Sequence, residues 1–227
     1  LGVADANPQG VLFVGAAPWI RGLATTLKEK GFRVLLVDTN RAHTAAARMS
    51  ELPTYNGSAL AEATLDEIDL GGIGKLVAAT PNDWVNVLAV KRFAPILGRN
   101  HCFQLPPAQQ SDSKRGRHEH LHGRYVFGRE HSYAALHWKY LCGARAKATR
   151  LSDSFRYDDF LARYGASAVP MFIITTEGSL VPATEDRDTP GPGETVIALV
   201  DDPDRPPSET KNASHETAER PAATVNP

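Results

Sequence analysis

The chain has 227 residues, of which 42% are hydrophobic and 22% are charged, and its net charge is −1. This composition is typical of a globular protein with one large or two small domains, and the balanced charge excludes a global field that would attract nucleic acid or an anionic membrane. No apolar run approaches the roughly 18 residues that a membrane-spanning helix needs, and the first residues lack the basic and apolar regions from which a secretion signal would be expected. Cys102 and Cys142 form no C-x-x-C pair, so reduced thiols are expected. Because the sequence starts at Leu1 rather than Met, we expect it to be part of a longer protein.

The first half of the chain alternates between short apolar runs and segments with helical spacing. Strands are predicted at 11–14, 34–37, 52–58, 75–80 and 101–107. Helices are predicted over 20–27, over 41–49, around Leu60, Leu65 and Ile68 with Ser58 as the cap, and around Val85, Leu88 and Ala89. Strands that are apolar throughout indicate burial on both faces, as in a parallel α/β sheet. Residues 10–107 are therefore predicted to form a Rossmann-like, doubly wound parallel sheet, preceded by a linker at 1–9.

The second half of the chain has a different character. A polar stretch at 108–124 is predicted to be a linker. Beyond it, the expected elements are strands within 123–128 and 143–151, helices at 133–141 and 157–164, a hairpin turn at 177–178 and a last strand within 190–200. Residues 125–202 are therefore predicted to be a small α+β domain, near the lower size limit for independent stability. Residues 203–227 have almost no large apolar side chains and are predicted to be a disordered tail.

The turn after the first strand keeps part of a dinucleotide-binding fingerprint. In G-x-G-x-x-G the glycines allow a tight turn, a close approach to pyrophosphate, and close packing of helix and strand. Gly15, Ala17 and Ile20 occupy these positions here, so the anion pocket is narrowed and the helix is expected to be pushed from the sheet. Pro18 is expected at the first helical position and removes one donor from the phosphate cradle. Asp38 follows about 20 residues later, at the distance of an acid that accepts from ribose hydroxyls.

Further candidate residues follow two other strands, at the edge of the sheet where ligands of open α/β folds bind. They belong to "NGS" at 56–58 and "TPNDWVN" at 80–86. Trp19 either stacks on a base or covers the end of the sheet. The predicted nucleotide-binding residues are Gly15, Ala16, Ala17, Trp19, Asp38, Thr39, Asn56, Gly57, Thr80 and Asp83. A Rossmann scaffold that has lost its ligand is the alternative interpretation of the altered fingerprint.

Several stretches together resemble one family. They are "GAAPWIRGLATTLKEKGFRVLLVDTN", "AARMSELPTYNGSAL", "LDEIDLGGIGKLVAATPNDWVNVLAV" and "FAPILGRNHCFQLPP". They are similar to the nucleotide-binding RCK domain (regulator of potassium conductance) at the cytoplasmic C-terminus of bacterial sodium/proton antiporters. The later "YGASAVPMFIITTEGSL" and "PGPGETVIALV" resemble the ends of such antiporters, so the resemblance covers residues 1–200 and is strongest in the first half.

The resemblance implies a non-enzymatic module that senses an adenine nucleotide and regulates the exchange of Na⁺ or K⁺ for protons. It implies a position on the cytoplasmic side of the inner membrane. The implied partners are a membrane-embedded antiporter domain in the same polypeptide and a second copy in a homodimer, with no nucleic acid. By position, Gly15 and Ala17 would lie at the phosphates and Asp38 at the ribose. Around the base or sugar the resemblance places Asn56, Thr80 and Asp83.

The sequence departs from the family at Ile20, Ser58 and Trp84, where relatives have a small residue or an acid. Because a mononucleotide needs fewer phosphate contacts than a dinucleotide, the narrowed cradle favours AMP or ADP over NAD or NADH. The alternatives are an NAD-dependent oxidoreductase, which needs an acid/base pair facing the cofactor, and a degenerate scaffold used only for dimerisation. No catalytic residue and no metal site are predicted. The spacing of His118, His120 and His122 suits zinc or nickel on one strand face, but it also suits a polar linker.

Overall fold

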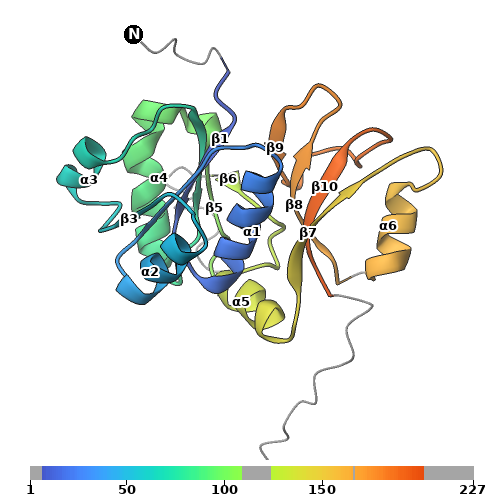
Figure 1. The fold of residues 1–227 in the computed structure, drawn as a ribbon, viewed down its shortest axis with the longest axis horizontal. Coiled ribbons are helices and arrows are strands. Elements are labelled where there is room, and N and C mark those ends of the chain that lie inside the picture. Colours follow the sequence, from blue (N-terminus) through green and yellow to red (C-terminus); the bar gives the residue numbers. More distant parts are fainter. Residues whose placement is uncertain (1–6, 109–123, 166, 202–227) are drawn as a thin grey trace, which may run out of the picture.

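The computed structural model of the chain describes residues 7–108, 124–165 and 167–201. The first half builds a parallel sheet in the order β3-β2-β1-β4-β5-β6, in which every neighbouring pair is parallel (Figure 1). Its strands are β1 (Gly10–Val14), β2 (Val34–Asp38), β3 (Thr54–Asn56), β4 (Ile73–Ala78), β5 (Cys102–Gln104) and β6 (Arg124–Tyr125). The connecting helices are α1 (Pro18–Glu29), α2 (Arg41–Met49), α3 (Glu62–Glu67) and α4 (Asp83–Leu97), with a 3-10 turn at Arg99–His101. The predicted doubly wound parallel sheet is confirmed.

An antiparallel sheet forms in the second half, in the order β7-β10-β8-β9. Its strands are β7 (Arg145–Arg150), β8 (Val169–Ile174), β9 (Leu180–Pro182) and β10 (Thr195–Val200), and the helices of this half are α5 (Tyr133–Leu141) and α6 (Tyr157–Tyr164). Both helices match the predicted ranges. The predicted hairpin also forms, because β8 and β9 pair antiparallel and the Thr175 amide donates to the Ser179 carbonyl at 2.9 Å.

The parallel sheet extends further along the chain than the predicted boundary. β6 pairs with β5 in parallel, with Phe103 opposite Arg124 and Gln104 opposite Tyr125. Tyr125, which the sequence assigns to the second domain, is therefore a member of the first sheet. Most of the predicted linker, 109–123, lies outside the described residues, as do the predicted tail at 203–227 and the three histidines at 118, 120 and 122.

The start of α3 differs from the prediction that Ser58 caps it. Ala61 is the N-cap of α3, and Leu60 and Ile68 lie outside the helix. The Ser58 hydroxyl instead accepts from the Leu60 amide at 3.2 Å, and the Ser58 carbonyl accepts from the Thr64 hydroxyl at 2.6 Å. Ser58 thus stabilises the turn before the helix rather than the helix itself. A serine–backbone bond two residues along the chain competes with capping for the same hydroxyl.

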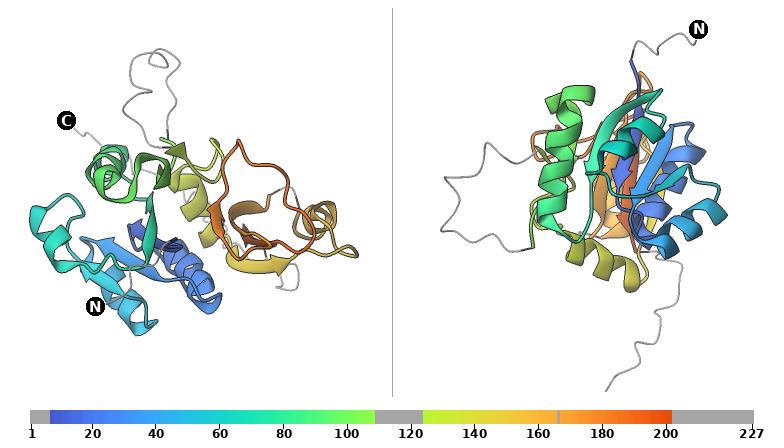
Figure 2. Two further views of the ribbon diagram at one scale, coloured as in Figure 1. Left: turned by 90° about the horizontal axis from the view of Figure 1, so that it is seen from above. Right: turned by 90° about the vertical axis from the view of Figure 1, so that its left-hand side faces the viewer.

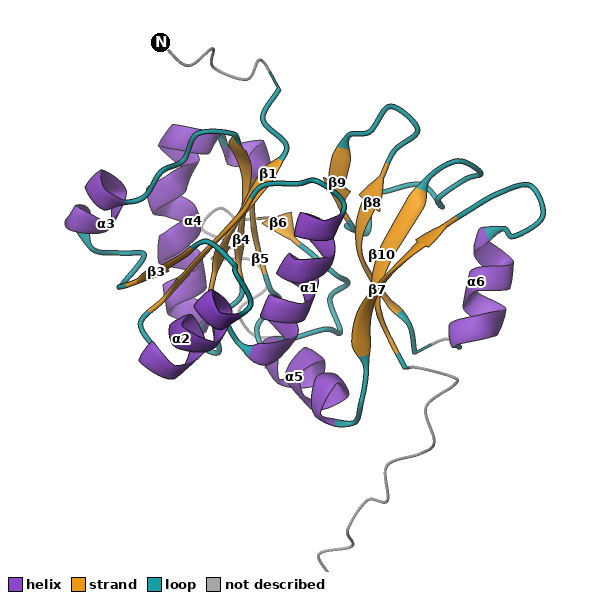
Figure 3. Cartoon of the chain, viewed as in Figure 1, coloured by secondary structure: helices purple, strands orange, loops and turns teal. Residues whose placement is uncertain are grey.

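The two sheets and their helices are arranged in layers. α4 lies on one face of the parallel sheet, and α1 and α2 lie on the other (Figure 2). α1 stands between the parallel sheet and the antiparallel sheet, and α6 lies on the far side of the antiparallel sheet (Figure 3). Among the described helices, none is long and apolar enough to cross a membrane. Cys102 is buried and Cys142 is exposed, and both are free thiols as expected.

The alternation of side chains along the strands explains this layering. Val11 and Phe13 of β1 belong to a core cluster that also holds Phe172 and Leu199 of the antiparallel sheet. Their neighbours in the same strand pack instead in a separate cluster under α4. The Phe13 and Phe172 rings meet edge to face, with centroids 6.3 Å apart. The second half therefore shares its core with the first, which explains how so small a unit is stabilised.

A polar link joins the two sheets beside this shared core. Gln9 Oε1 accepts from Lys75 Nζ of β4 at 3.0 Å and from the Leu180 amide of β9 at 2.9 Å. Lys75 is buried, with 8% of its surface exposed, and burial lowers the pKa of its ammonium group. Residue 9, predicted to belong to a linker, is therefore part of the packed structure.

Candidate functional site

A cavity of about 380 Å³ opens where β1, β2 and β4 end. This volume lies within the roughly 300–1,000 Å³ of small-molecule sites. The cavity is at the carboxyl ends of parallel strands, where open α/β sheets bind their ligands. It is lined by residues 14–17, 37–40, 43, 57–59, 79–82 and 85, and by Tyr133. Seven of the ten predicted site residues are on this wall: Gly15, Ala16, Ala17, Asp38, Thr39, Gly57 and Thr80.

The turn after β1 requires the one glycine that the fingerprint keeps. Gly15 has φ of +114°, and a Cβ there would lie 2.8 Å from the Ala79 carbonyl oxygen. Ile20 lies directly beside the turn, since its Cδ1 would be 3.2 Å from the same Cβ. Although Ile20 is expected to push α1 from the sheet, it is fully buried in the shared core together with Leu23. The bulk of Ile20 is thus accommodated between the two sheets.

The N-terminal end of α1 lies beside the cavity, because its N-cap residue Ala17 is on the wall. Pro18 is the first helical residue, as predicted, and Ala17 is the N-cap. The Ala17 methyl cannot accept a hydrogen bond, so no side chain caps the helix. The first-turn amides and the helix dipole therefore give this part of the wall a partial positive charge. Such a helix start suits a phosphate or another anion.

Asp38 organises the wall opposite the α1 start. Its Oδ2 accepts from the Ala16 amide at 2.7 Å and lies 3.1 Å from His43 Nδ1, and its Oδ1 accepts from the Asn40 amide at 2.9 Å. A carboxylate has about four acceptor positions, so about one remains for a ligand. The side chain is 15% exposed. Asp38 therefore fixes the turn after β1 and also lines the cavity.

His43 and Asn40 are wall residues that the sequence analysis did not select. Asn40 caps α2 by accepting from the Ala42 amide at 2.9 Å and the His43 amide at 3.2 Å. This cap places the His43 ring beside Asp38. An asparagine two residues after the strand, followed three residues later by a histidine, is the signal that was available for both.

The segment at the end of β3 stabilises the cavity wall through contacts with the end of β2. Asn56 is not on the wall, because its Nδ2 donates to the carbonyls of Asp38 at 3.1 Å and Thr39 at 3.3 Å. Gly57 lines the cavity, and a Cβ there would lie 2.4 Å from the Tyr55 ring. Asn56 thus holds the end of β2 in place rather than facing the cavity.

A buried asparagine fixes the turn before α4. The Asn86 side chain, fully buried, accepts from the Thr80 amide at 2.9 Å and from the Thr80 hydroxyl at 2.8 Å. It also donates to the Thr80 carbonyl at 3.0 Å. Thr80 therefore shapes the wall, while its hydroxyl is engaged within the protein. Asp83, the first residue of α4, is exposed and off the wall, and Asn82 caps this helix.

Trp19 packs in the core instead of facing the cavity. It is 1% exposed and belongs to the cluster shared by the two sheets. Its ring meets Tyr133 edge to face, with centroids 6.2 Å apart. Of the two predicted roles, covering the end of the sheet is the one that this position fits. Stacking on a base is not compatible with so complete a burial.

Tyr133 reaches the cavity from α5, in the second half of the chain. Burial raises the pKa of its phenol, and the nearby Asp38 carboxylate raises it further. The ring stacks on His137, with centroids 5.7 Å apart and an interplanar angle of 12°. Tyr133 lies about 95 residues after Asp38 in the sequence, and no sequence motif links the two. The position of Tyr133 at the cavity therefore depends on how the two halves of the chain pack.

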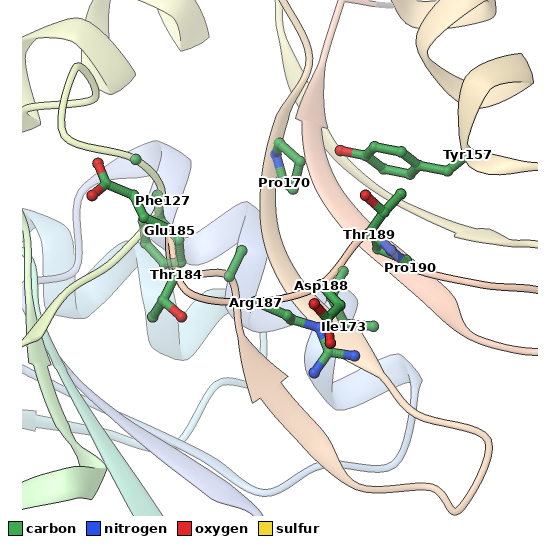
Figure 4. A pocket seen from close by; sticks show the side chains of 12 residues that line it. Phe127, Tyr157, Pro170, Ile173, Thr184, Glu185, Arg187, Asp188, Thr189 and Pro190 are labelled. Atoms are coloured by element: carbon green, nitrogen blue, oxygen red, sulfur yellow. The ribbon is translucent and has the colours of Figure 1, made fainter.

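A second cavity of about 220 Å³ lies against the antiparallel sheet (Figure 4). Tyr157 of α6, Ile173 of β8 and the loop 183–190 line it. Arg187 Nη2 is paired with Glu194 Oε1 at 2.8 Å, which neutralises the guanidinium beside this cavity. Within the described ranges no group of three or more side chains is suited to hold a metal ion.

The comparisons with known proteins concern mainly the parallel sheet. Residues 11–99 match the model of the TrkA-N domain, and no curated protein matches the chain. One similar structure is the NAD(P)-binding domain of an exopolyphosphatase-related protein from Archaeoglobus fulgidus, with a TM-score of 0.40 and 16% identity over 52% of this chain and 85% of that chain. The TrkA-N domain of the inner membrane protein ybaL from Escherichia coli has a TM-score of 0.37 and 15% identity over 44% of this chain and 76% of that chain.

The GsuK channel bound to NAD has a TM-score of 0.42 and 12% identity over 87% of this chain and 38% of that chain. This chain therefore spans well under half of the channel protein's length. None of these three likenesses bears on function at such TM-scores. The family match is limited to the first half and agrees with the strand order described above. Residues 11–99 form a Rossmann fold and are similar to the TrkA-N domain, which supports the RCK-like resemblance for this part of the chain.

Proposed function

We propose that the chain is the regulatory domain of a monovalent cation/proton antiporter and binds an adenine nucleotide in the cavity beside Asp38. One observation carries this proposal. The uncapped start of α1, the Gly15 turn and the Asp38 carboxylate all face one cavity at the ends of the parallel strands. The start of α1 suits a phosphate, and the Asp38 carboxylate suits ribose hydroxyls. The TrkA-N match and the sequence resemblance support the same class of ligand.

The charges on the wall favour a nucleotide with few phosphates. No lysine or arginine is among the wall residues that the structure describes, and Arg21 lies beside the wall with Nη1 donating to the Ala16 carbonyl at 3.1 Å. The anion would therefore rely on amides, the helix dipole and this one guanidinium. That dipole is equivalent to roughly half a positive charge, which matches a monophosphate better than a triphosphate. The Ala16 amide is already engaged by Asp38, and the Ala17 methyl narrows the cradle. We therefore propose AMP, followed by ADP, ahead of NAD and NADH.

The proposed role is binding without catalysis. The titratable wall side chains Asp38, His43 and Tyr133 gather at one place. This is where the ribose is expected, whereas a hydride acceptor would lie at the far end of a dinucleotide. General acid–base catalysis needs the group at the reacting centre. Their position supports recognition of the sugar rather than a reaction.

We propose as partners a membrane-embedded antiporter domain in the same polypeptide, on the cytoplasmic side of the inner membrane, and a second copy of this chain. The sequence resemblance supports the first. Exposed apolar side chains support a protein contact, since Trp84 and Leu88 lie one turn apart on α4 and are 72% and 46% exposed. Trp138 on α5 is 68% exposed. Clustered exposed apolar residues mark contact surfaces more often than isolated ones do.

Calorimetric titration of the purified chain with AMP, ADP, ATP, NAD and NADH tests the proposed ligand. We expect AMP to bind most tightly and Asp38→Asn to weaken it about 10- to 100-fold, because a hydrogen bond to a charged group contributes about 1.5–3 kcal/mol. Asp153→Ala, an exposed acid away from the wall, is the control and should bind as the wild type does. Tighter binding of NAD than of AMP contradicts the ligand proposed, and no binding by any nucleotide overturns the function.

A further inference from the structure

We infer that Tyr133 is a ligand-binding residue that recognises the ribose diol of the bound nucleotide and makes nucleotide affinity depend on the docking of α5. This inference rests on the proposed function. Tyr133 differs from the rest of the described wall, because every other wall residue lies between positions 14 and 85, inside the first half of the chain. The site is therefore completed by the second half.

The position of Tyr133 relative to Asp38 defines what it can recognise. Both side chains face the same cavity, and the Asp38 charge acts on the Tyr133 phenol. Ionised Asp38 can only accept hydrogen bonds, whereas a phenol donates and accepts. A phenol keeps its proton at neutral pH, and burial together with the Asp38 charge raises the pKa of Tyr133 further from that range. A ribose hydroxyl between the two can donate to Asp38 and accept from Tyr133.

The Tyr133 ring is held by α5 and α1 together. Trp19 of α1 meets one side of the ring edge to face, and His137, one turn along α5, stacks on it. Ser132 caps α5 by accepting from the Ala135 amide at 3.4 Å, and Leu136 is fully buried in the shared core. The ring is therefore held at the wall by contacts with both α1 and α5. A ligand that contacts Tyr133 stabilises this docked arrangement, and by linkage the docked arrangement strengthens ligand binding.

The matched comparison is between Tyr133 and Tyr157. Each is the first residue of a helix, and burial raises the pKa of both phenols. Each ring also stacks on an aromatic neighbour in its own helix, since Tyr157 stacks on Phe160 at 5.7 Å. Tyr157, however, lines the second cavity and not the first. Tyr157→Phe and Tyr157→Ala therefore control for the loss of a half-buried tyrosine.

The test is calorimetric titration of the chain and its variants with AMP and with 2′,3′-dideoxy-AMP. For AMP we expect Tyr133→Phe to weaken binding about 2- to 10-fold, the effect of one hydrogen bond of about 0.5–1.5 kcal/mol. Tyr133→Ala should weaken it further, and both Tyr157 variants should match the wild type. The dideoxy nucleotide should bind the wild type and Tyr133→Phe equally, because it lacks the diol.

Hydrogen exchange provides a second measurement that does not depend on the alanine variant folding well. AMP should slow exchange of the amides of 133–141 in the wild type, and this protection should be reduced in Tyr133→Phe. If the wild type binds AMP while Tyr133→Phe and Tyr133→Ala bind it equally well, or if α5 gains no protection, the inference is overturned and the proposed function stands. If the wild type binds no nucleotide, the proposed function itself fails.

Discussion

The two faces of the parallel sheet are closed in different ways. Under α4, Leu12, Leu76 and Phe93 form a cluster of their own, bounded by α3 and α4. On the opposite face, the Phe13 ring directly meets Phe172 of the antiparallel sheet, in a cluster that also holds residues of α1. The first face is a closed core, whereas the second joins the two halves of the chain. Since Tyr133 approaches the cavity from the joined side, that face is where ligand binding and the packing of the halves meet.

Removal of a ring from the joined face should have the largest effect. Phe172 is fully buried and meets the rings of Phe13 and Phe127. Phe172→Ala should reduce the free energy of unfolding by about 3–5 kcal/mol. Because the core is shared, both halves should unfold in one transition in urea, followed by circular dichroism and tryptophan fluorescence.

Phe93→Ala provides the comparison on the closed face. Phe93 is also fully buried, so a similar loss of about 3–5 kcal/mol is expected. Amide exchange should then increase under α4 while the antiparallel sheet stays protected. Separate transitions for the two halves of the wild type would contradict the shared core.

The turn at the end of β1 should show the next largest effect. Gly15→Ala forces a side chain into positive φ and toward the Ala79 carbonyl, which should cost about 1–3 kcal/mol of stability and block AMP binding. Gly143→Ala is the control, since Gly143 has φ of +116° but a Cβ there would meet no other atom within 4 Å. A loss for Gly15→Ala no greater than for Gly143→Ala would show that the close approach to Ala79 is unimportant.

The smallest effect is expected at Lys75, the charged side chain buried beside the junction. Because its pKa is lowered on folding, the unfolded chain binds more protons between the folded pKa and the ordinary value of 10.5, and stability rises with pH in that window. Lys75→Met removes the buried charge and should raise stability by about 1 kcal/mol at neutral pH. This advantage should shrink as pH approaches 10.5, as measured by urea unfolding at several pH values. A variant that is less stable than the wild type at neutral pH would contradict this account.

Local patterns were sufficient to predict most of the elements. The apolar strands β1, β2 and β4, the helix at 133–141 and the hairpin at 177–178 follow from residue spacing alone. The Gly15 turn and the placement of Asp38 on the cavity wall followed from spacing as well. Each of these features depends on residues that are neighbours in sequence, so periodicity and turn chemistry carry the information.

The features that were missed depend on contacts between distant segments. The strand predicted within 123–128 forms as β6, but its place in the first sheet was missed because it depends on pairing with β5. Trp19 lies next to the cradle in sequence, yet the antiparallel sheet and α5 bury it. Tyr133 reaches the wall only because α5 docks on α1. No local propensity encodes such arrangements, because tertiary packing decides them.

The amide oxygen of Gln9 has a mechanical consequence. Since one atom holds both an ammonium of β4 and a backbone N–H of β9, a shift of the polypeptide just ahead of β1 strains both sheets at once. A displacement of Gln9 would disturb both hydrogen bonds directly, without an intervening helix, and a rearrangement of either sheet would in turn displace Gln9. The position of this residue is thereby coupled to both sheets.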